Sequence, residues 1–178
     1  MIKIVSLILL VLLVPGLTAL AHVEKGSMPD SVAEMEYRIL LEFKPEDTVT
    51  RSLLGMALLR QNKLSEAEKE FRQLLKTDPK SFDALDSLGL VLLKQKRFPE
   101  ALQLLQTAIT IRPDDIMAHL HLGVTLGYCG QIEPARRTLI TGINLIDSHP
   151  SVAREQQLAE FQSAIAALPK QSVITSRK

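Results

Sequence analysis

Small residues and prolines recur along this chain at a fixed step. The positions that repeat are Gly55, Gly89 and Gly123; Ala67, Ala101 and Ala135; and Pro45, Pro79 and Pro113. Members of each set are 34 residues apart, which is the length of one helix–turn–helix unit. Small residues let two helices approach closely, and prolines end helices. The period therefore predicts an all-α solenoid, in which each unit packs against its neighbours.

Three full units follow from this step: Thr48–Ser81, Phe82–Asp115 and Ile116–His149. A Leu-Gly pair, a further leucine and a small alanine recur in each, as in Leu54-Gly55, Leu58 and Ala67 of the first unit. With this pattern the chain resembles the tetratricopeptide repeat family, which implies three stacked helix–turn–helix units.

The third unit departs from the pattern at its end. Gly142 replaces the small alanine equivalent to Ala108, and Asp147 stands where a proline is expected. Pro150 follows shortly afterwards and still encodes a helix stop.

The turns inside the units are predicted near Asn62, Lys96 and Gly130. Asn and Gly tolerate the left-handed conformation that ends a helix, whereas Lys suits it less well. Ser65 and Glu68 have the spacing of a capping box, which predicts the start of a second helix.

The period also extends beyond the full units. Residues 30–47 are expected to form a capping half repeat, with Asp30–Phe43 as a second helix that lacks its first helix. Residues 150–168 lack the Leu-Gly pair, and Ser151–Leu168 is expected to be a closing helix. Residues 22–29 are interpreted as a linker and residues 169–178 as a disordered tail.

Residues 1–21 have the pattern of a secretory signal. Lys3 gives a positive start, an apolar stretch follows, and Ala19-Leu20-Ala21 provides a small-x-small cleavage site. The alternatives are a retained membrane anchor, which needs about 20 apolar residues, and a cytosolic protein. Cleavage and retention both lead us to expect an exported protein, in the periplasm or at the outside face of the inner membrane.

Charge and composition give little support to other classes of function. Without the leader the chain has 20 basic and 20 acidic residues, so we expect no nucleic-acid partner. Cys129 is the only cysteine. His119 and His121 point about 200° apart on a helix and are expected to be structural. Because no catalytic or cofactor motif appears, we expect neither an enzyme nor a cofactor or metal.

The resemblance implies that the first helices line a concave groove, which is the expected partner-binding site. The positions in the first unit are Val49, Ser52, Met56, Leu59 and Arg60. Those in the second unit are Asp83, Asp86, Leu90, Leu93 and Lys94, and those in the third are Met117, Leu120, Val124, Gly127 and Tyr128.

These positions predict the character of the groove. Met56, Leu90 and Val124 would form an apolar strip, and the two aspartates of the second unit would add an acidic spot. Such a strip suits a peptide or helix segment of another protein. Alternatively, some of these side chains pack between units.

The main functional hypothesis is a non-catalytic adaptor that helps an envelope complex to assemble. Relatives of this kind take part in cytochrome c maturation, pilus assembly and secretion. Ser52 and Met56 occupy places where chaperone-binding members hold a C-terminal carboxylate, so that ligand is not expected. The alternative is self-association, in which the groove of one copy takes up the closing helix or tail of another. A membrane contact is expected only if the leader is retained.

Overall fold

The computed structural model describes residues 29–148 and 152–169. The predicted leader, most of the linker, the Pro150 stop and residues 170–178 of the tail lie outside these ranges. Eight helices and no strand occupy the described part, which confirms the all-α fold. They are α2 (Asp30–Phe43), α3 (Thr48–Arg60), α4 (Leu64–Thr77), α5 (Phe82–Lys94), α6 (Phe98–Ile111), α7 (Ile116–Tyr128), α8 (Ile132–Ser148) and α9 (Arg154–Ala167).

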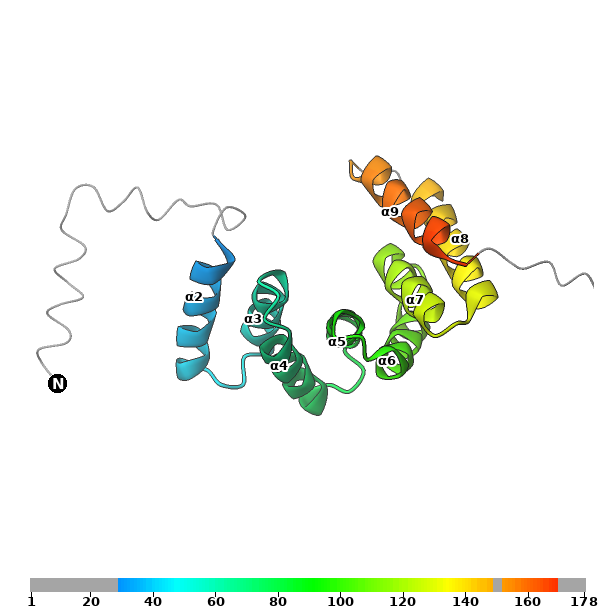
Figure 1. Ribbon diagram of the computed structural model, residues 1–178. Coiled ribbons are helices and arrows are strands. Elements are labelled where there is room, and N and C mark those ends of the chain that lie inside the picture. Colours follow the sequence, from blue (N-terminus) through cyan, green and yellow to red (C-terminus); the bar gives the residue numbers. More distant parts are fainter. Residues whose placement is uncertain (1–28, 149–151, 170–178) are drawn as a thin grey trace, which may run out of the picture.

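The helices follow one another along an arc, in the order of the sequence (Figure 1). The pairs α3/α4, α5/α6 and α7/α8 are the three full units, and α2 and α9 lie at the two ends. Each helix packs mainly on the helices before and after it in the chain. This arrangement is an α-solenoid. Among the described helices, none has both the length and the apolar character needed to cross a membrane.

Each first helix begins with a side chain that caps it. The N-cap residues are Asp47, Ser81 and Asp115, and each side chain accepts a backbone N–H of the first turn. The side chain of Asp47 also accepts a hydrogen bond from the hydroxyl of Thr50, at 2.9 Å. Hydrogen bonds from the Thr50 hydroxyl and backbone lower the pKa of Asp47. The caps share the 34-residue step of the glycines, so every unit starts its first helix in the same way.

Left-handed residues form the turn inside each unit, as predicted. Asn62, Lys96 and Gly130 have φ values of 58°, 63° and 75°. In the second unit, the N–H of Arg97 donates to the carbonyl of Leu92 at 2.9 Å. The same bond recurs in the other two units. This pattern is a Schellman motif, which satisfies carbonyls at the end of the first helix.

The capping box predicted at Ser65 and Glu68 is wrong. Helix α4 begins at Leu64 and has no side-chain cap, because the preceding turn brings the chain into the helix two residues earlier than a cap at Ser65 would. Glu68 instead accepts two hydrogen bonds from Arg97 of the next unit, at 2.8 and 2.9 Å. Its carboxylate therefore joins two units rather than starting a helix.

Small residues set the distance between the two helices of each unit. A Cβ atom at Gly89 would lie 2.6 Å from Leu105, and equivalent clashes occur at Gly55 and Gly123. The alanines of the repeat, Ala67, Ala101 and Ala135, are completely buried. One apolar core, built mainly of leucine, runs through all three units to the closing helix.

The departure at Gly142 has a structural reason. A Cβ atom there would collide with the ring of Phe161 on α9 and would lie 3.2 Å from the Cβ of His119. Phe161 is fully buried. Gly142 thus makes room for the closing helix α9. Within the described residues, α9 is shorter than the expected helix Ser151–Leu168.

Helix α2 is fixed to the first full unit by a buried carboxylate. Glu34 accepts hydrogen bonds from Lys63 Nζ at 2.6 Å, Gln61 Nε2 at 2.9 Å and Arg38 Nε at 3.0 Å. The bond from Lys63, supported by those from Gln61 and Arg38, lowers the pKa of Glu34 from 4.5 to about 2. Two of the three donors lie in the turn between α3 and α4, so this cluster connects α2 to the next unit.

Candidate functional site

An open depression lies where the first and second units meet. It has a volume of about 330 Å³, and α3, α4 and α5 supply residues that line it. Three predicted groove residues, Val49, Ser52 and Asp83, are among them. Val49 is 68% exposed and Leu53 beside it is 44% exposed, while Leu74 is buried. This part of the predicted groove therefore combines accessible apolar surface with a carboxylate.

The other predicted residues of the first unit differ in accessibility. Met56 is half-buried, and its sulfur accepts the hydroxyl of Ser87 on α5 at 3.6 Å. Leu59 is only 7% exposed and belongs to the core, so little of it is available to a partner. Arg60 is exposed and donates to Asp30 of α2 at 2.7 Å. The alternative of packing between units thus applies to Leu59 and partly to Met56.

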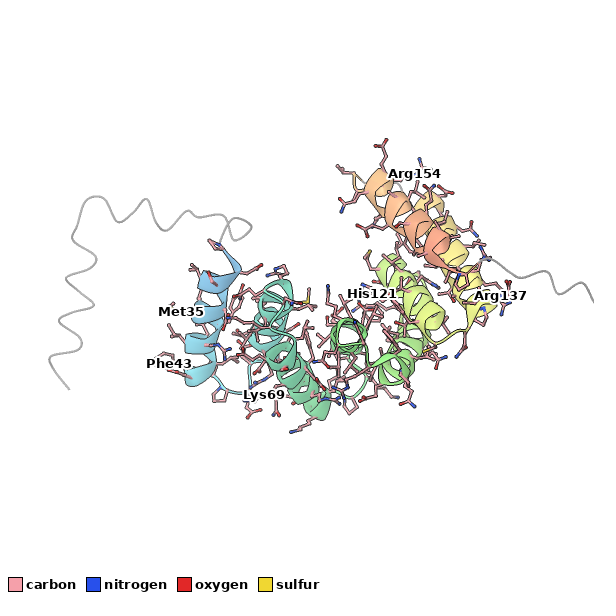
Figure 2. All side chains as sticks on the ribbon, in the orientation of Figure 1. Met35, Phe43, Lys69, His121, Arg137 and Arg154 are labelled. Atoms are coloured by element: carbon pink, nitrogen blue, oxygen red, sulfur yellow. The ribbon has the colours of Figure 1, made fainter. Side chains whose placement is uncertain are left out.

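Both aspartates of the second unit have basic partners. Asp83 lies 3.1 Å from Arg112, whose guanidinium also lies 4.0 Å from the centre of the Phe82 ring. His121, labelled in Figure 2, donates through Nδ1 to Asp86 at 2.9 Å, and both side chains are largely buried. Both residues of the acidic spot expected from the sequence therefore have a basic neighbour.

The apolar strip is only partly accessible. Lys94 is exposed, whereas five predicted apolar residues of α5 and α7 are half-buried: Leu90, Leu93, Met117, Leu120 and Val124. Three of them, the leucines, also pack against the core. These residues lie on first helices, and only part of each side chain is exposed to solvent. The apolar strip is therefore shallow.

The third unit ends the groove with an aromatic pair and the closing segment. Tyr128 is 64% exposed, and its ring stacks on Phe98 with centroids 4.6 Å apart and planes 3° from parallel. A Cβ atom at Gly127 would lie 2.7 Å from Leu168, just after α9. Because α9 packs on α7 and α8 of its own chain, it is not free to enter the groove of another copy in this structure.

The remaining polar candidates have structural contacts. Buried His119 donates through Nε2 to the carbonyl of Pro113 at 2.8 Å, while its Nδ1 has no partner in the structure. Cys129 is a half-buried free thiol at the end of α7. Within residues 29–148 and 152–169, no three His, Cys, Asp or Glu side chains are grouped as metal ligands would be.

The sequence contained a signal for the Asp86–His121 pair that the period alone did not reveal. The two residues are 35 apart, which is one repeat plus one residue. This offset places them on first helices of neighbouring units, with His121 one position further along. A search for charge pairs at offsets near the period would have found it.

Comparisons with known proteins agree with this architecture. Residues 52–116 match a family model described as tetratricopeptide repeat. No curated protein sequence matches the chain. Among solved structures, MamA residues 41-end from Desulfovibrio magneticus RS-1 is similar, with a TM-score of 0.62 and 21% identity over 77% of this chain and 84% of that one. The TPR2B domain of yeast Sti1, in complex with pHsp70, has a TM-score of 0.59 and 17% identity over 66% and 94%.

The fold and its groove define an all-helical repeat protein, a class whose architecture is suited to a protein-interaction scaffold. The repeat pattern, the match of residues 52–116 to the family model and the likeness to these solved structures all indicate a fold of the tetratricopeptide repeat type.

Proposed function

We propose that this protein is a non-catalytic adaptor of the cell envelope. Its concave groove holds a peptide or helix segment of another protein and helps a complex to assemble. The observation that carries this proposal is the depression between the first two units, where exposed Val49 and Leu53 lie beside Asp83. Exposed apolar surface in a hollow usually marks an interaction site.

The chemistry of the depression indicates the kind of segment it fits. Apolar side chains of α3 would contact an apolar residue of the partner. Asp78 and Asp83 also line the depression, and Asp78 caps the end of α4. A basic residue of the partner would lie close to Asp78 and would compete with Arg112 for the exposed carboxylate of Asp83. An apolar segment with a nearby Lys or Arg is therefore the favoured ligand.

The TPR2B domain of Sti1 is in complex with pHsp70, which is an example of a protein-binding use of this fold. That domain shares the fold at low identity, which carries no ligand over to this chain. Ser52 and Met56 do not supply the Lys-and-Asn pairing expected for a C-terminal carboxylate. We therefore propose recognition of an internal apolar segment, in a complex of the cytochrome c maturation, pilus or secretion type.

Site-specific photo-crosslinking of the full chain in its native envelope tests the groove. A photo-reactive residue replaces Val49 in one variant and Gln106, an exposed residue of second helix α6, in a control. The expected result is one crosslinked protein partner at position 49 and none at position 106. Adding Ser52→Arg, which narrows the depression, should reduce that crosslink at least about tenfold. Equal crosslinking at both positions, or none at position 49, would overturn the groove assignment.

The envelope location is a separate part of the proposal and rests on the leader pattern of residues 1–21. Sequencing the N-terminus of the protein purified from its native cells tests it. His22 at the N-terminus would support cleavage and export, whereas Met1 together with extraction from membranes only by detergent would support a retained anchor. A soluble cytosolic protein that begins at Met1 would contradict the envelope proposal.

A further inference from the structure

Helix α2 exposes an apolar face along its whole length. We call this face the α2 stripe; its residues and exposed fractions are Val32 (47%), Met35 (63%), Ile39 (48%), Leu40 (44%) and Phe43 (80%). Met35 and Phe43 lie on the side of α2 that faces away from α3 (Figure 2). Nearly half of the large apolar residues that are exposed in the described part belong to this one helix, so the face is not the scattered exposure usual for a surface.

The repeat itself does not require apolar residues on this face. Helix α4 occupies the same place one unit later, with every position shifted by 34 residues. At the positions that match Val32, Met35, Ile39 and Phe43, α4 has four polar residues: Glu66, Lys69, Gln73 and Thr77. Lys69 projects into solvent from this face of α4 (Figure 2). Leu40, the fifth residue of the stripe, matches Leu74, which is buried. At the other four positions, the outward face of a second helix is polar in the first full unit and apolar in the half unit.

The two ends of the solenoid differ in the same respect. Terminal helices of a repeat array need a polar outer face to remain soluble. Helix α9 meets this need, because its exposed side chains include Glu155, Gln156, Gln162 and Ser163. Helix α2 does not meet it, so the N-terminal end has the character of an interface rather than of a cap.

Charge argues against a lipid bilayer as the partner of this face. Helices that lie on anionic membranes carry Lys and Arg beside their apolar face. Helix α2 instead carries four acidic residues, Asp30, Glu34, Glu36 and Glu42, and a single basic one, Arg38. Asp30 and Glu34 are paired with Arg60 and Lys63, and Arg38 is paired with Glu34 and Glu66. The exposed carboxylates of Glu36 and Glu42 therefore remain beside the apolar face, and anionic headgroups would repel them.

We propose that a second copy of this chain covers the α2 stripe, by a two-fold contact between the two α2 helices. A two-fold contact pairs each stripe with itself, so the apolar side chains of one copy meet those of the other. Stacking of α2 onto the far end of another copy would instead place the stripe against the polar face of α9. An antiparallel arrangement also opposes the two helix dipoles.

The area involved predicts the strength of this contact. The exposed parts of five apolar side chains amount to about 500 Å² per copy, or about 1,000 Å² in total, which is below the range of standard stable interfaces. The dimer should therefore be reversible and dissociate in the micromolar range. It leaves the groove of each copy open, because the stripe is on the half unit and the depression lies between the first two full units.

Thiol crosslinking of the full chain in intact cells tests this contact. Cys129→Ser removes the native thiol, and Ile39→Cys places one near the centre of the stripe. Gln73→Cys is the control at the same position on α4; because Gln73 is half-buried, each dimer yield is divided by the labelling of the same thiol with a monofunctional maleimide. A short bis-maleimide should give a product of twice the chain mass with Ile39→Cys, and at least about tenfold less with Gln73→Cys. Adding Met35→Lys and Phe43→Thr to Ile39→Cys should abolish it.

Four outcomes would overturn the proposal. Equal dimer yield from both cysteines would indicate random collision. A product of another mass would assign the stripe to a different protein. If the thiol at position 39 reacts with a monofunctional maleimide but forms no dimer, the face is free. If this thiol neither reacts nor forms a dimer, the rest of the same chain covers the face.

The molecular mass of the purified full chain, measured by analytical ultracentrifugation, provides an independent test. The replacements Val32→Glu, Met35→Lys, Ile39→Gln and Phe43→Thr transfer the outer face of α4 onto α2. We expect the wild type to move from one to two chain masses as its concentration rises through tens of micromolar, and the variant to remain at one. Circular dichroism checks folding; if the fourfold variant is unfolded, Ile39→Gln alone is compared. A wild type that stays monomeric at these concentrations would contradict the dimer.

This inference stands apart from the proposed groove. Val49→Glu should abolish partner binding and leave the dimer intact, whereas the fourfold variant should lose the dimer and keep the crosslink at position 49. Failure of one proposal would therefore not be mistaken for failure of the other.

Discussion

Lys96 adopts a left-handed conformation that costs an ordinary residue about 1–2 kcal/mol, with φ at 63°. Gly130 occupies the equivalent turn with φ at 75°, and a Cβ atom there would meet nothing within 4 Å. Because the side chain of Lys96 is exposed, mutations at these two positions change the backbone contribution to the free energy of unfolding with little effect on side-chain packing. They form a reciprocal pair for mutation.

We expect Lys96→Gly to raise the free energy of unfolding by about 0.5–1 kcal/mol. The gain is smaller than the full conformational cost, because glycine also loses more backbone entropy on folding. Gly130→Ala should lower the free energy of unfolding by about 1 kcal/mol. Urea unfolding of the two variants checks both signs. Destabilisation by Lys96→Gly would show that the lysine side chain contributes more than the strained backbone costs.

Gly142 offers a second prediction about a single residue, because it lies against the ring of Phe161. Gly142→Ala should lower the free energy of unfolding by about 1–3 kcal/mol, the usual cost of overpacking a well-packed core. The neighbouring Thr141 is exposed, so Thr141→Ala should change it by less than about 0.5 kcal/mol. Thermal unfolding compares the two. Equal effects would mean that α9 adjusts freely and does not depend on this contact.

Among the helices, α2 should be the one whose attachment to the rest of the protein is weakened most when the pH falls. The pKa of Glu34 is lowered from 4.5 to about 2 by its hydrogen bonds, first of all that from Lys63. A lowered pKa in the folded state stabilises the fold above the unfolded pKa. The contribution is therefore fully present above about pH 4.5 and is lost as pH falls towards 2.

We expect the stability of the wild type to fall more steeply between pH 5 and pH 3 than that of Glu34→Gln, which cannot titrate at this position. Glu36→Gln is the matched control, because Glu36 is exposed on the same helix. Urea unfolding at each pH, with amide exchange of α2 as the local readout, makes the comparison. Parallel pH profiles for the wild type and Glu34→Gln would contradict the role of this carboxylate.

The sequence predicted the helices better than it predicted their caps. Glycine, alanine and proline have roles fixed by sterics, so their spacing located the units and the turns. The capping-box pattern at Ser65 depends instead on where α4 begins, and the turn at Asn62 moved that start to Leu64. The aspartate and serine caps of the first helices repeat at the same step and could have been recognised from it.

The groove was harder to predict than the fold. The period places a residue on a first helix, but packing against the neighbouring unit decides how much of it remains accessible. Leu59 and Val49 were both expected in the groove, yet one is in the core and the other is largely exposed. Asp83 pairs with Arg112, just after α6, and Asp86 pairs with His121 of α7. Such pairings depend on how two units meet.

For the whole molecule, stability should be highest at the centre of the array and lowest at its ends. Helices α5 and α6 contribute Leu88, Leu92 and Leu105 to the core, each at most 1% exposed. Helix α2 buries only Ala33 and Glu34, and α9 buries only Phe161. In a repeat protein each unit is stabilised by its immediate neighbours, so a terminal helix has fewer stabilising contacts.

Amide hydrogen exchange should therefore be slowest in α5 and α6 and fastest in α2 and α9. The measurement is made at low micromolar concentration, where the proposed dimer is dissociated. Raising the concentration should slow exchange in α2 and leave α9 unchanged. An α2 that exchanges as slowly as α5 at low concentration would contradict this order.

The recurrence of one turn and one cap in every unit also makes the length of the molecule adjustable. A second copy of Phe82–Asp115, inserted after Asp115, would bring its own cap, left-handed turn and small residues. Both end helices would keep their present neighbours, and only one new junction would arise. Gene duplication could thus lengthen the ligand site in steps of one unit, and the sequence of each end could evolve independently of how many units lie between them.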